Sequence, residues 1–189
     1  MDTVSQESPS VFDVIHPLDE FYKRGGKPLP PYQKLDGSQV PEPFKGLLVH
    51  KNDMTPTLEK FHGARIHIRV LGKTLSENQY YREVVLLLDE SEKPVEFGAI
   101  RINLDRFPEE AREAILGETL PLGTILADFK IDHTSRPKAF LKVASDPMIN
   151  EALGLTGAWG ACILYGRRNT LYDHENHPIA EIVEVLPMD

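Results

Sequence analysis

The sequence predicts an α+β fold in which helices pack on a single antiparallel β-sheet. Residues 80–89 and 94–104 are two aliphatic segments joined by the polar turn Asp89-Glu-Ser-Glu-Lys93, which is the pattern of an antiparallel hairpin. Residues 161–172 and 178–186 repeat this arrangement with the same Asp-to-Pro spacing in the turn. Only short helical segments separate the predicted strands. Antiparallel strands combined with short helices are typical of the α+β class.

The predicted strands follow from side-chain parity. In residues 64–71, Ile66, Ile68 and Val70 share one face, and polar residues occupy the other. The strand over residues 80–89 is aliphatic on both parities from Val84 to Leu88, so we expect it to be central and covered on both faces. Residues 138–144 alternate in the manner of a strand, as residues 64–71 do. The repeated Asp-to-Pro turn indicates either a duplicated hairpin or a coincidence between two turns.

The predicted helices follow from capping and breaking residues. Thr55 suits an N-cap, Pro56 the first helical position and Gly63 the stop, which predicts a helix over residues 55–62. Glycine stops and proline starts predict further helical segments over residues 108–116, 119–129 and 147–153, with a short helix also expected within 11–23. Residues 24–43 are broken by glycine and proline and are expected to form an irregular strap. We therefore divide the chain into an N-terminal extension, residues 1–43, and one domain, residues 44–189.

Composition excludes several classes of protein. The chain has 189 residues, 41% of them hydrophobic, which suits one folded domain rather than a disordered chain. Its formal net charge of -8 argues against nucleic-acid and anionic-membrane partners, which usually require a basic surface. The longest unbroken aliphatic run, Val84 to Leu88, is far too short to cross a bilayer, and residues 1–10 lack a signal pattern. We expect a cytoplasmic protein, either a monomer or a homodimer.

No cofactor or metal is expected. The seven histidines include no His-x-x-x-His pair, and His174 and His177 fall in a polar turn without a clear third ligand. Cys162 is the single cysteine, which excludes an intrachain disulfide. It lies among apolar residues of a strand, as expected for a buried structural thiol. The chain also lacks a phosphate-binding glycine loop followed by a helix and a Gly-x-Ser-x-Gly elbow.

Arg82 is the strongest candidate for a binding residue. It lies within an aliphatic strand, and a buried guanidinium requires a carboxylate or phosphate partner. Glu83 points to the opposite face of the strand and cannot pair easily with it. Arg82 therefore either holds a ligand carboxylate with two parallel hydrogen bonds or forms a structural salt bridge to another strand.

Glu181 is the corresponding candidate acid. It shares one face of the final strand with Val183, whereas Glu184 faces the other way. Burial would raise the pKa of the Glu181 carboxyl and make it a usable proton donor. The alternative is an exposed carboxylate on the solvent face.

Four segments in the right order resemble the chorismate lyase family, whose members make 4-hydroxybenzoate and pyruvate from chorismate. They are residues 47–59, the triplet Tyr81-Arg82-Glu83, residues 116–123, and Gly166-Arg167-Arg168 with residues 178–187. Residues 128–159 resemble instead the ligand-sensing UTRA domains of bacterial regulators, which share that fold. The resemblance implies a ligand cavity between sheet and helices. Residues 1–43 are too short and too rich in proline for the winged helix that precedes a UTRA domain.

The resemblance also implies a site. Arg82 would hold the ring carboxylate, backbone groups of Gly98 and Leu122 would assist, and Met54 would line the pocket. The family's glutamate on the last strand corresponds, in an ungapped match, to Val183. Glu181 lies about 7 Å away on the same face and could replace it, whereas use of Glu184 would need a bulge.

Two main functions follow from this resemblance, and a different reaction on a related acid is a third. The first is a cofactor-free lyase acting on chorismate or a close relative. The second is a non-catalytic binding protein for a small aromatic acid, which the valine at position 183 favours. In both cases the partner is a small anionic aromatic or cyclohexadienyl ligand. A second carboxylate on it could meet one of four arginines, among which the sequence does not choose: Arg65, Arg69, Arg167 and Arg168.

Overall fold

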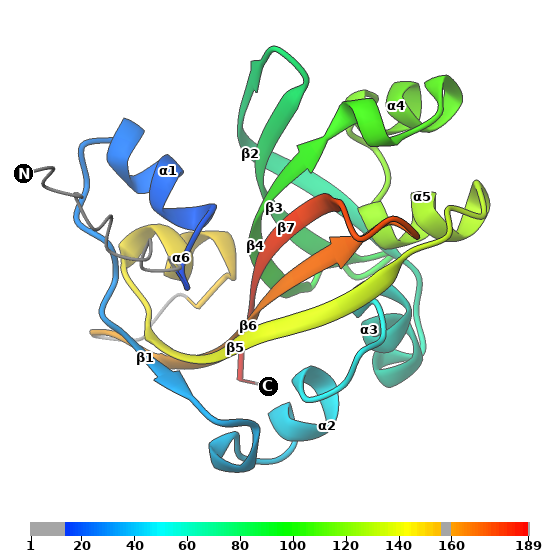
Figure 1. The fold of residues 1–189 in the computed structure, drawn as a ribbon. Helices are drawn as coiled ribbons and strands as arrows, with labels where there is room; N and C mark the ends of the chain where they lie inside the picture. The colour runs from blue at the N-terminus through cyan, green and yellow to red at the C-terminus, as the bar shows by residue number, and fades with distance from the viewer. Residues whose placement is uncertain (1–13, 156–159, 189) are drawn as a thin grey trace, which may run out of the picture.

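The computed structural model describes residues 14–155 and 160–188, and confirms an α+β fold built on one antiparallel sheet (Figure 1). The sheet has seven strands in the order β1-β5-β6-β7-β4-β3-β2. The strands are β1 (Tyr32–Leu35), β2 (Ile66–Ser76), β3 (Gln79–Leu88), β4 (Pro94–Asn103), β5 (Thr134–Ala144), β6 (Ile163–Tyr172) and β7 (Pro178–Leu186). The helices are α1 (Leu18–Arg24), α2 (Phe44–Leu48), α3 (Met54–His62), α4 (Glu109–Leu116), α5 (Leu122–Asp128) and α6 (Pro147–Ala152), with 3-10 turns at Gly37–Gln39 and Leu104–Arg106.

Two three-stranded meanders make up most of the sheet. β2, β3 and β4 form one, β5, β6 and β7 form the other, and the two join through antiparallel pairing of β4 with β7. The turns with the repeated Asp-to-Pro spacing close the β3–β4 and β6–β7 hairpins. This arrangement agrees with a duplicated hairpin. It also places β4 and β7 at the centre of the sheet, where their side chains are covered on both faces.

Helices cover both faces of the sheet (Figure 1). On one face, which we call the α1 face, α1 and α6 pack against a single apolar cluster that includes Leu18, Ile149, Phe97 and Val183. On the other, the α3 face, α2 and α3 pack against one cluster, and α4 and α5 pack against a second. The α3 face therefore has two cores with a boundary between them, and that boundary positions the site described below.

The structure differs from the sequence-based expectations mainly in the N-terminal part. Residues 32–35, expected to be irregular, form the edge strand β1 because they pair with residues 140–143 of β5. Helix α3 begins at Met54, with Asp53 rather than Thr55 at its N-cap, and ends as expected at Gly63, which adopts a left-handed conformation. Residues 1–13 lie outside the described part, and the division of the chain at residue 43 stays a prediction.

Two smaller expectations concern exposure and membrane insertion. Cys162 is only partly buried, because it precedes the first residue of β6 instead of lying inside the strand. Among the described residues, no helix has the length and apolar character needed to span a bilayer.

Glu83 on the α1 face predicts a pH dependence of stability. Its side chain is buried, and desolvation, reinforced by the charge of Asp146, raises the pKa of the carboxyl to about 7. Between pH 4.5 and 7 the folded protein keeps a proton on Glu83 that the unfolded chain has released. The contribution of Glu83 to the free energy of unfolding is therefore fully present below about pH 4.5 and is lost as the pH rises through 7. The loss is at most about 3 kcal/mol. We expect Glu83→Gln to flatten this fall when urea unfolding is compared at pH 5 and pH 8; equal slopes in both proteins would contradict it.

Candidate functional site

A buried cavity lies on the α3 face, at the boundary between the two apolar clusters of that face. Its volume is about 60 Å³, which is room for a few water molecules and less than the roughly 150 Å³ of a cavity that binds benzene. Its walls come from the start of α3, from α5 with the proline before it, and from five strands. The lining residues are Asp53, Met54, Thr55, Ile68, Arg82, Val84, Leu86, Glu96, Gly98, Ala99, Ile100, Pro121, Leu122, Gly123, Leu126, Arg167, Asn169, Leu171, Ile182 and Glu184.

Charged side chains are concentrated in this otherwise apolar cavity. Arg82, Glu96, Arg167 and Glu184 project from four neighbouring central strands, and none is more than 4% exposed. Strand parity explains why they meet. Residue 82 lies opposite 100, 96 opposite 86, and 184 opposite both 98 and 167, so all four side chains point to the α3 face. Buried charges are costly unless they are paired, so the partners of each one indicate what the cavity can bind.

Arg82 is only weakly satisfied by the protein. Its Nη1 and Nη2 atoms donate to the carbonyl oxygens of Ile115 and Leu120 over long distances of 3.4 and 3.5 Å, and its buried Nε atom has no partner. No carboxylate oxygen of a described residue lies within 4.0 Å of the guanidinium. The Tyr80 side chain also interacts with the guanidinium. The acid whose charge acts on Arg82 is Glu118, which is already held by Lys73 at 2.8 Å and by the Tyr80 hydroxyl at 2.5 Å. Of the two alternatives for Arg82, the structural salt bridge is absent from the described residues.

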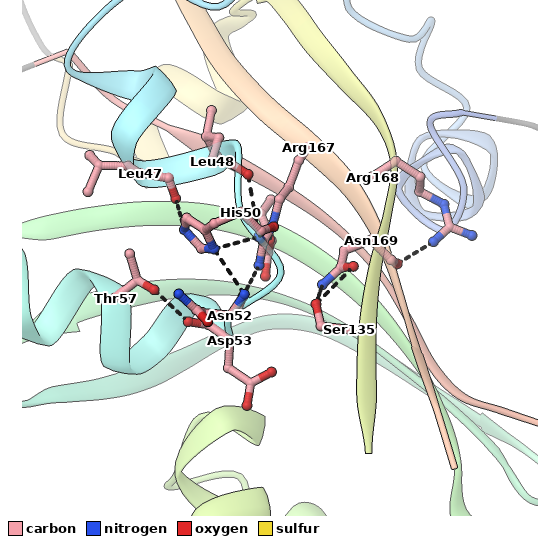
Figure 2. A network of polar contacts seen from close by, with 11 residues as sticks. Leu47, Leu48, His50, Asn52, Asp53, Thr57, Ser135, Arg167, Arg168 and Asn169 are labelled. Carbon is pink, nitrogen blue, oxygen red and sulfur yellow. Dashed lines mark hydrogen bonds and ion pairs between the residues drawn. The ribbon is translucent and has the colours of Figure 1, made fainter. Parts of the chain in front are cut away.

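Arg167 is fully satisfied. Its Nε atom donates to Glu184 Oε2 at 2.6 Å, and both side chains are buried. Its other nitrogens donate to main-chain oxygens before α3: to Leu48 at 3.5 Å, to His50 at 3.2 Å and to Asn52 at 3.0 Å (Figure 2). Arg167 therefore neutralises Glu184 and fixes the segment that leads into α3.

Asp53, at the end of that segment, forms a second attachment. Its carboxylate is 2.9 Å from Nε2 of His133, and this contact raises the pKa of the imidazole by favouring its charged form. The segment that leads into α3 is thus held at two places: Arg167 binds its main-chain oxygens, and His133 binds the Asp53 carboxylate. Arg167 and His133 also give the acidic side chains Glu184 and Asp53 a partner within the protein.

Glu96 has no protein partner. Its side chain is 4% exposed and forms no hydrogen bond or ion pair with a described residue, and its Oε2 atom is buried and unpaired. Burial, reinforced by the charge of Glu184 and opposed by Arg167, raises the pKa of this carboxyl well above its usual range. This shift favours the protonated, neutral form of Glu96. Our sequence analysis missed it, although an acid inside the apolar strand Pro94–Asn103 is the same kind of signal that identified Arg82.

Four residues predicted for the site do line one cavity. Arg82, Met54, Gly98 and Leu122 all contribute to its walls. Gly98 leaves room between the two acids, because a Cβ atom there would lie 3.4 Å from Glu96 Oε1 and 2.9 Å from a backbone oxygen of β7. Of the four arginines left open, only Arg167 is among the lining residues. The others pair elsewhere: Arg65 with Glu59, Arg69 with Glu92, and Arg168 with Glu181.

Glu181 and Val183 do not face the cavity, which corrects two of the predicted positions. Both point to the α1 face, where Glu181 is held by Arg101 at 2.7 Å and by Arg168 at 2.8 Å, and Val183 is part of the apolar core. The β7 carboxylate in the cavity is Glu184. It needs no bulge, since the register with β4 and with β6 is regular at this residue. The ungapped match gave Val183, one residue before Glu184, and a one-residue change reverses the face of a strand.

A possible metal cluster lies far from the cavity. The β6–β7 turn brings Asp173, Glu175 and His177 within 4.8 Å of one another, so it offers the third ligand that the sequence analysis did not find. Arg106 occupies this cluster, with its Nη1 atom 3.5 Å from Asp173 and 3.2 Å from His177. A guanidinium in that place forms ion pairs with the acidic side chains and would repel a bound cation.

Comparisons with known proteins support the fold. No protein-family model matches the sequence, and no curated protein matches it. Among solved structures, PhnF from Mycobacterium smegmatis has a TM-score of 0.55 and 12% identity, covering 89% of this chain and 92% of that one. The effector domain of PhnF has a TM-score of 0.51 and 13% identity, covering 71% and 88%.

The gene product SA0254 from Staphylococcus aureus has a TM-score of 0.51 and 11% identity, covering 65% of this chain and 83% of that one. Identities this low establish a common fold and nothing further. None of these three structures is described as a chorismate lyase. The chain therefore shares its fold with the effector domain of PhnF.

Proposed function

We propose that this chain binds a small organic acid in the buried cavity, with Arg82 as the anchor for the ligand carboxylate. The observation that carries this proposal is the state of the Arg82 side chain. It is 2% exposed, has an unpaired Nε atom, and has no carboxylate of a described residue within 4.0 Å. A buried guanidinium is stable only with an anionic partner, and a ligand carboxylate would supply two parallel charge-assisted hydrogen bonds.

The rest of the cavity favours a single negative charge on an apolar body. Arg167 is paired with Glu184, and Asp53 is in contact with His133, so Arg82 is the arginine without a direct counterion among the lining residues. The intervening walls are apolar, which suits an aromatic or cyclohexadienyl ring. They are formed by Ile68, Val84, Leu86, Ile100, Leu122 and Leu126. The fold shared with a domain described as an effector domain is consistent with small-molecule binding.

Calorimetric titration with benzoate and 4-hydroxybenzoate tests the proposal. We expect Arg82→Met to weaken binding of both probes by about 10- to 100-fold, because a charge-assisted hydrogen bond is worth about 1.5–3 kcal/mol. The matched control is Arg101→Met, which removes an arginine from the α1 face outside the cavity and should change affinity less than about twofold.

Arg82→Met should not unfold the protein, because replacing an unpaired buried charge with an apolar side chain is neutral or stabilising. Its thermal midpoint should equal or exceed that of the unmodified chain. If the unmodified chain binds neither probe, or if Arg82→Met binds them equally well, the proposal is wrong.

The two acids in the cavity favour lyase activity on chorismate as a second candidate function. In that reaction the ring C–O bond to the enolpyruvyl group breaks, the adjacent ring carbon loses a proton, and aromatisation gives 4-hydroxybenzoate and pyruvate. In its protonated form Glu96 would donate a proton to the departing group, and Glu184 would accept the ring proton. Pyruvate release from chorismate should then exceed the spontaneous rate and fall in Glu96→Gln. A rate equal to the spontaneous one rejects the lyase and leaves the binding proposal in place.

A further inference from the structure

The Glu96 carboxyl is a polar group inside the cavity that the preceding contacts do not use. It is 4% exposed, it lines the cavity, and it forms no hydrogen bond or ion pair with a described residue. Leaving a buried polar atom unsatisfied costs about 1–3 kcal/mol. Such a group inside a ligand cavity indicates that a ligand atom completes it.

We propose that Glu96 is a second recognition group of this cavity, which as a neutral carboxylic acid donates a hydrogen bond to an uncharged oxygen of the ligand. This inference rests on the proposed function, because it concerns the ligand that Arg82 anchors. It narrows the ligand class to a monocarboxylate with a hydroxyl, ether or carbonyl oxygen at the end remote from the carboxylate. The two ends of the ligand would thus be bound by chemically different groups, the carboxylate by Arg82 and the uncharged oxygen by Glu96.

The sheet register supports one ligand bridging both groups. Arg82 lies opposite Ile100 on β4, and Glu96 is four residues from Ile100 on the same strand. Four residues correspond to about 13 Å along the strand, and both side chains line the same cavity. The Arg82 guanidinium lies against the carbonyl oxygens of Ile115 in α4 and Leu120 before α5. A ligand that reaches both groups therefore needs polar groups at its two ends.

The charges around Glu96 explain why the remote group is uncharged. Arg167 lies near Glu96, but its donors are occupied by Glu184 and by the main-chain oxygens of Leu48, His50 and Asn52. A second ligand carboxylate would find no unused cation there and would face Glu184. An uncharged oxygen avoids this repulsion and still accepts a hydrogen bond from the Glu96 carboxyl group. Desolvation raises the pKa of Glu96 well above its usual range and so favours the protonated form that can donate this hydrogen bond.

Pairs of benzoates matched in shape provide the experiment. 4-Hydroxybenzoate carries a hydroxyl group where 4-methylbenzoate carries a methyl group. 4-Nitrobenzoate carries an uncharged nitro group where terephthalate carries a second, charged carboxylate. We expect the unmodified chain to bind 4-hydroxybenzoate about tenfold more tightly than 4-methylbenzoate, equivalent to about 1.4 kcal/mol. 4-Nitrobenzoate should likewise bind about tenfold more tightly than terephthalate.

Two substitutions at position 96 separate recognition from packing. Glu96→Gln keeps a hydrogen-bond donor and should retain the preference for 4-hydroxybenzoate. Glu96→Met keeps similar size without the polar group and should remove that preference while leaving the affinity for benzoate within about twofold. Thermal unfolding of each variant checks that it is folded.

The outcomes distinguish this inference from the proposal on which it rests. Benzoate binding that depends on Arg82, with the hydroxyl preference unchanged in Glu96→Met, overturns the role of Glu96 and preserves the anchor. Terephthalate binding more tightly than 4-nitrobenzoate overturns the uncharged ligand class. Absence of binding by every benzoate, including benzoate itself, overturns the anchor and this inference with it.

Discussion

Replacing Arg167 with methionine should lower the free energy of unfolding by about 3–5 kcal/mol, one of the two largest effects we expect from a single substitution in this chain. The guanidinium is fully buried and is the ion-pair partner of Glu184 at 2.6 Å. Removing it leaves a buried carboxylate without a counterion beside a second buried acid, Glu96. It also removes the donors for three main-chain oxygens before α3. Urea unfolding at pH 7 measures the change.

The double variant Arg167→Met/Glu184→Met is the matched control. Replacing both members of a buried ion pair with apolar side chains of similar volume is often neutral, so the double variant should recover a large part of the lost stability. The three main-chain oxygens still lack donors, so we expect recovery to be incomplete. A single variant that loses less than about 1 kcal/mol would show that the pair is not a major source of stability.

The effect of Arg167 illustrates what sequence parity can and cannot predict about the site. Parity correctly separated Glu184 from Glu181 and Val183, and it identified Arg82 as a cation in an apolar strand. It could not show which face holds the cavity, because both faces of the central strands are apolar. That choice depends on which helices cover each face. It therefore rested on a family resemblance, whose ungapped match gave Val183 on the α1 face and not Glu184, which lines the cavity.

The fold was more predictable than the site, because its strongest signals are local. The hairpins β3–β4 and β6–β7 and the stop of α3 at Gly63 each follow from residues within one short segment. Strand β1 was missed, since only pairing with β5 more than 100 residues away makes it a strand. The contacts of Arg167 with the loop before α3 have the same long-range character. Long-range pairing cannot be read from the pattern of a single segment.

Gly166→Ala should also destabilise the protein by about 3 kcal/mol or more, because it forces apart two central strands. An added Cβ atom would clash with the carbonyl oxygen of Glu184, and it would lie 3.1 Å from the carbonyl carbon of that residue and 3.2 Å from the Cα of Val185. All three are backbone atoms, so no side-chain rotation relieves the overlap. The displaced residues adjoin the Arg167–Glu184 pair, so the cavity wall should move as well.

Gly46→Ala is the matched control for this prediction. Gly46 lies inside helix α2, and the nearest atom to an added Cβ is the side-chain oxygen of Glu42 at an ordinary 3.6 Å. Alanine at this position should stabilise the helix by about 0.5–1 kcal/mol, since it restricts the unfolded chain more than glycine does. The same substitution should thus have opposite signs at the two positions in urea unfolding. A Gly166→Ala variant as stable as the unmodified chain would contradict the close contact between the backbones of β6 and β7 at Gly166 and Glu184.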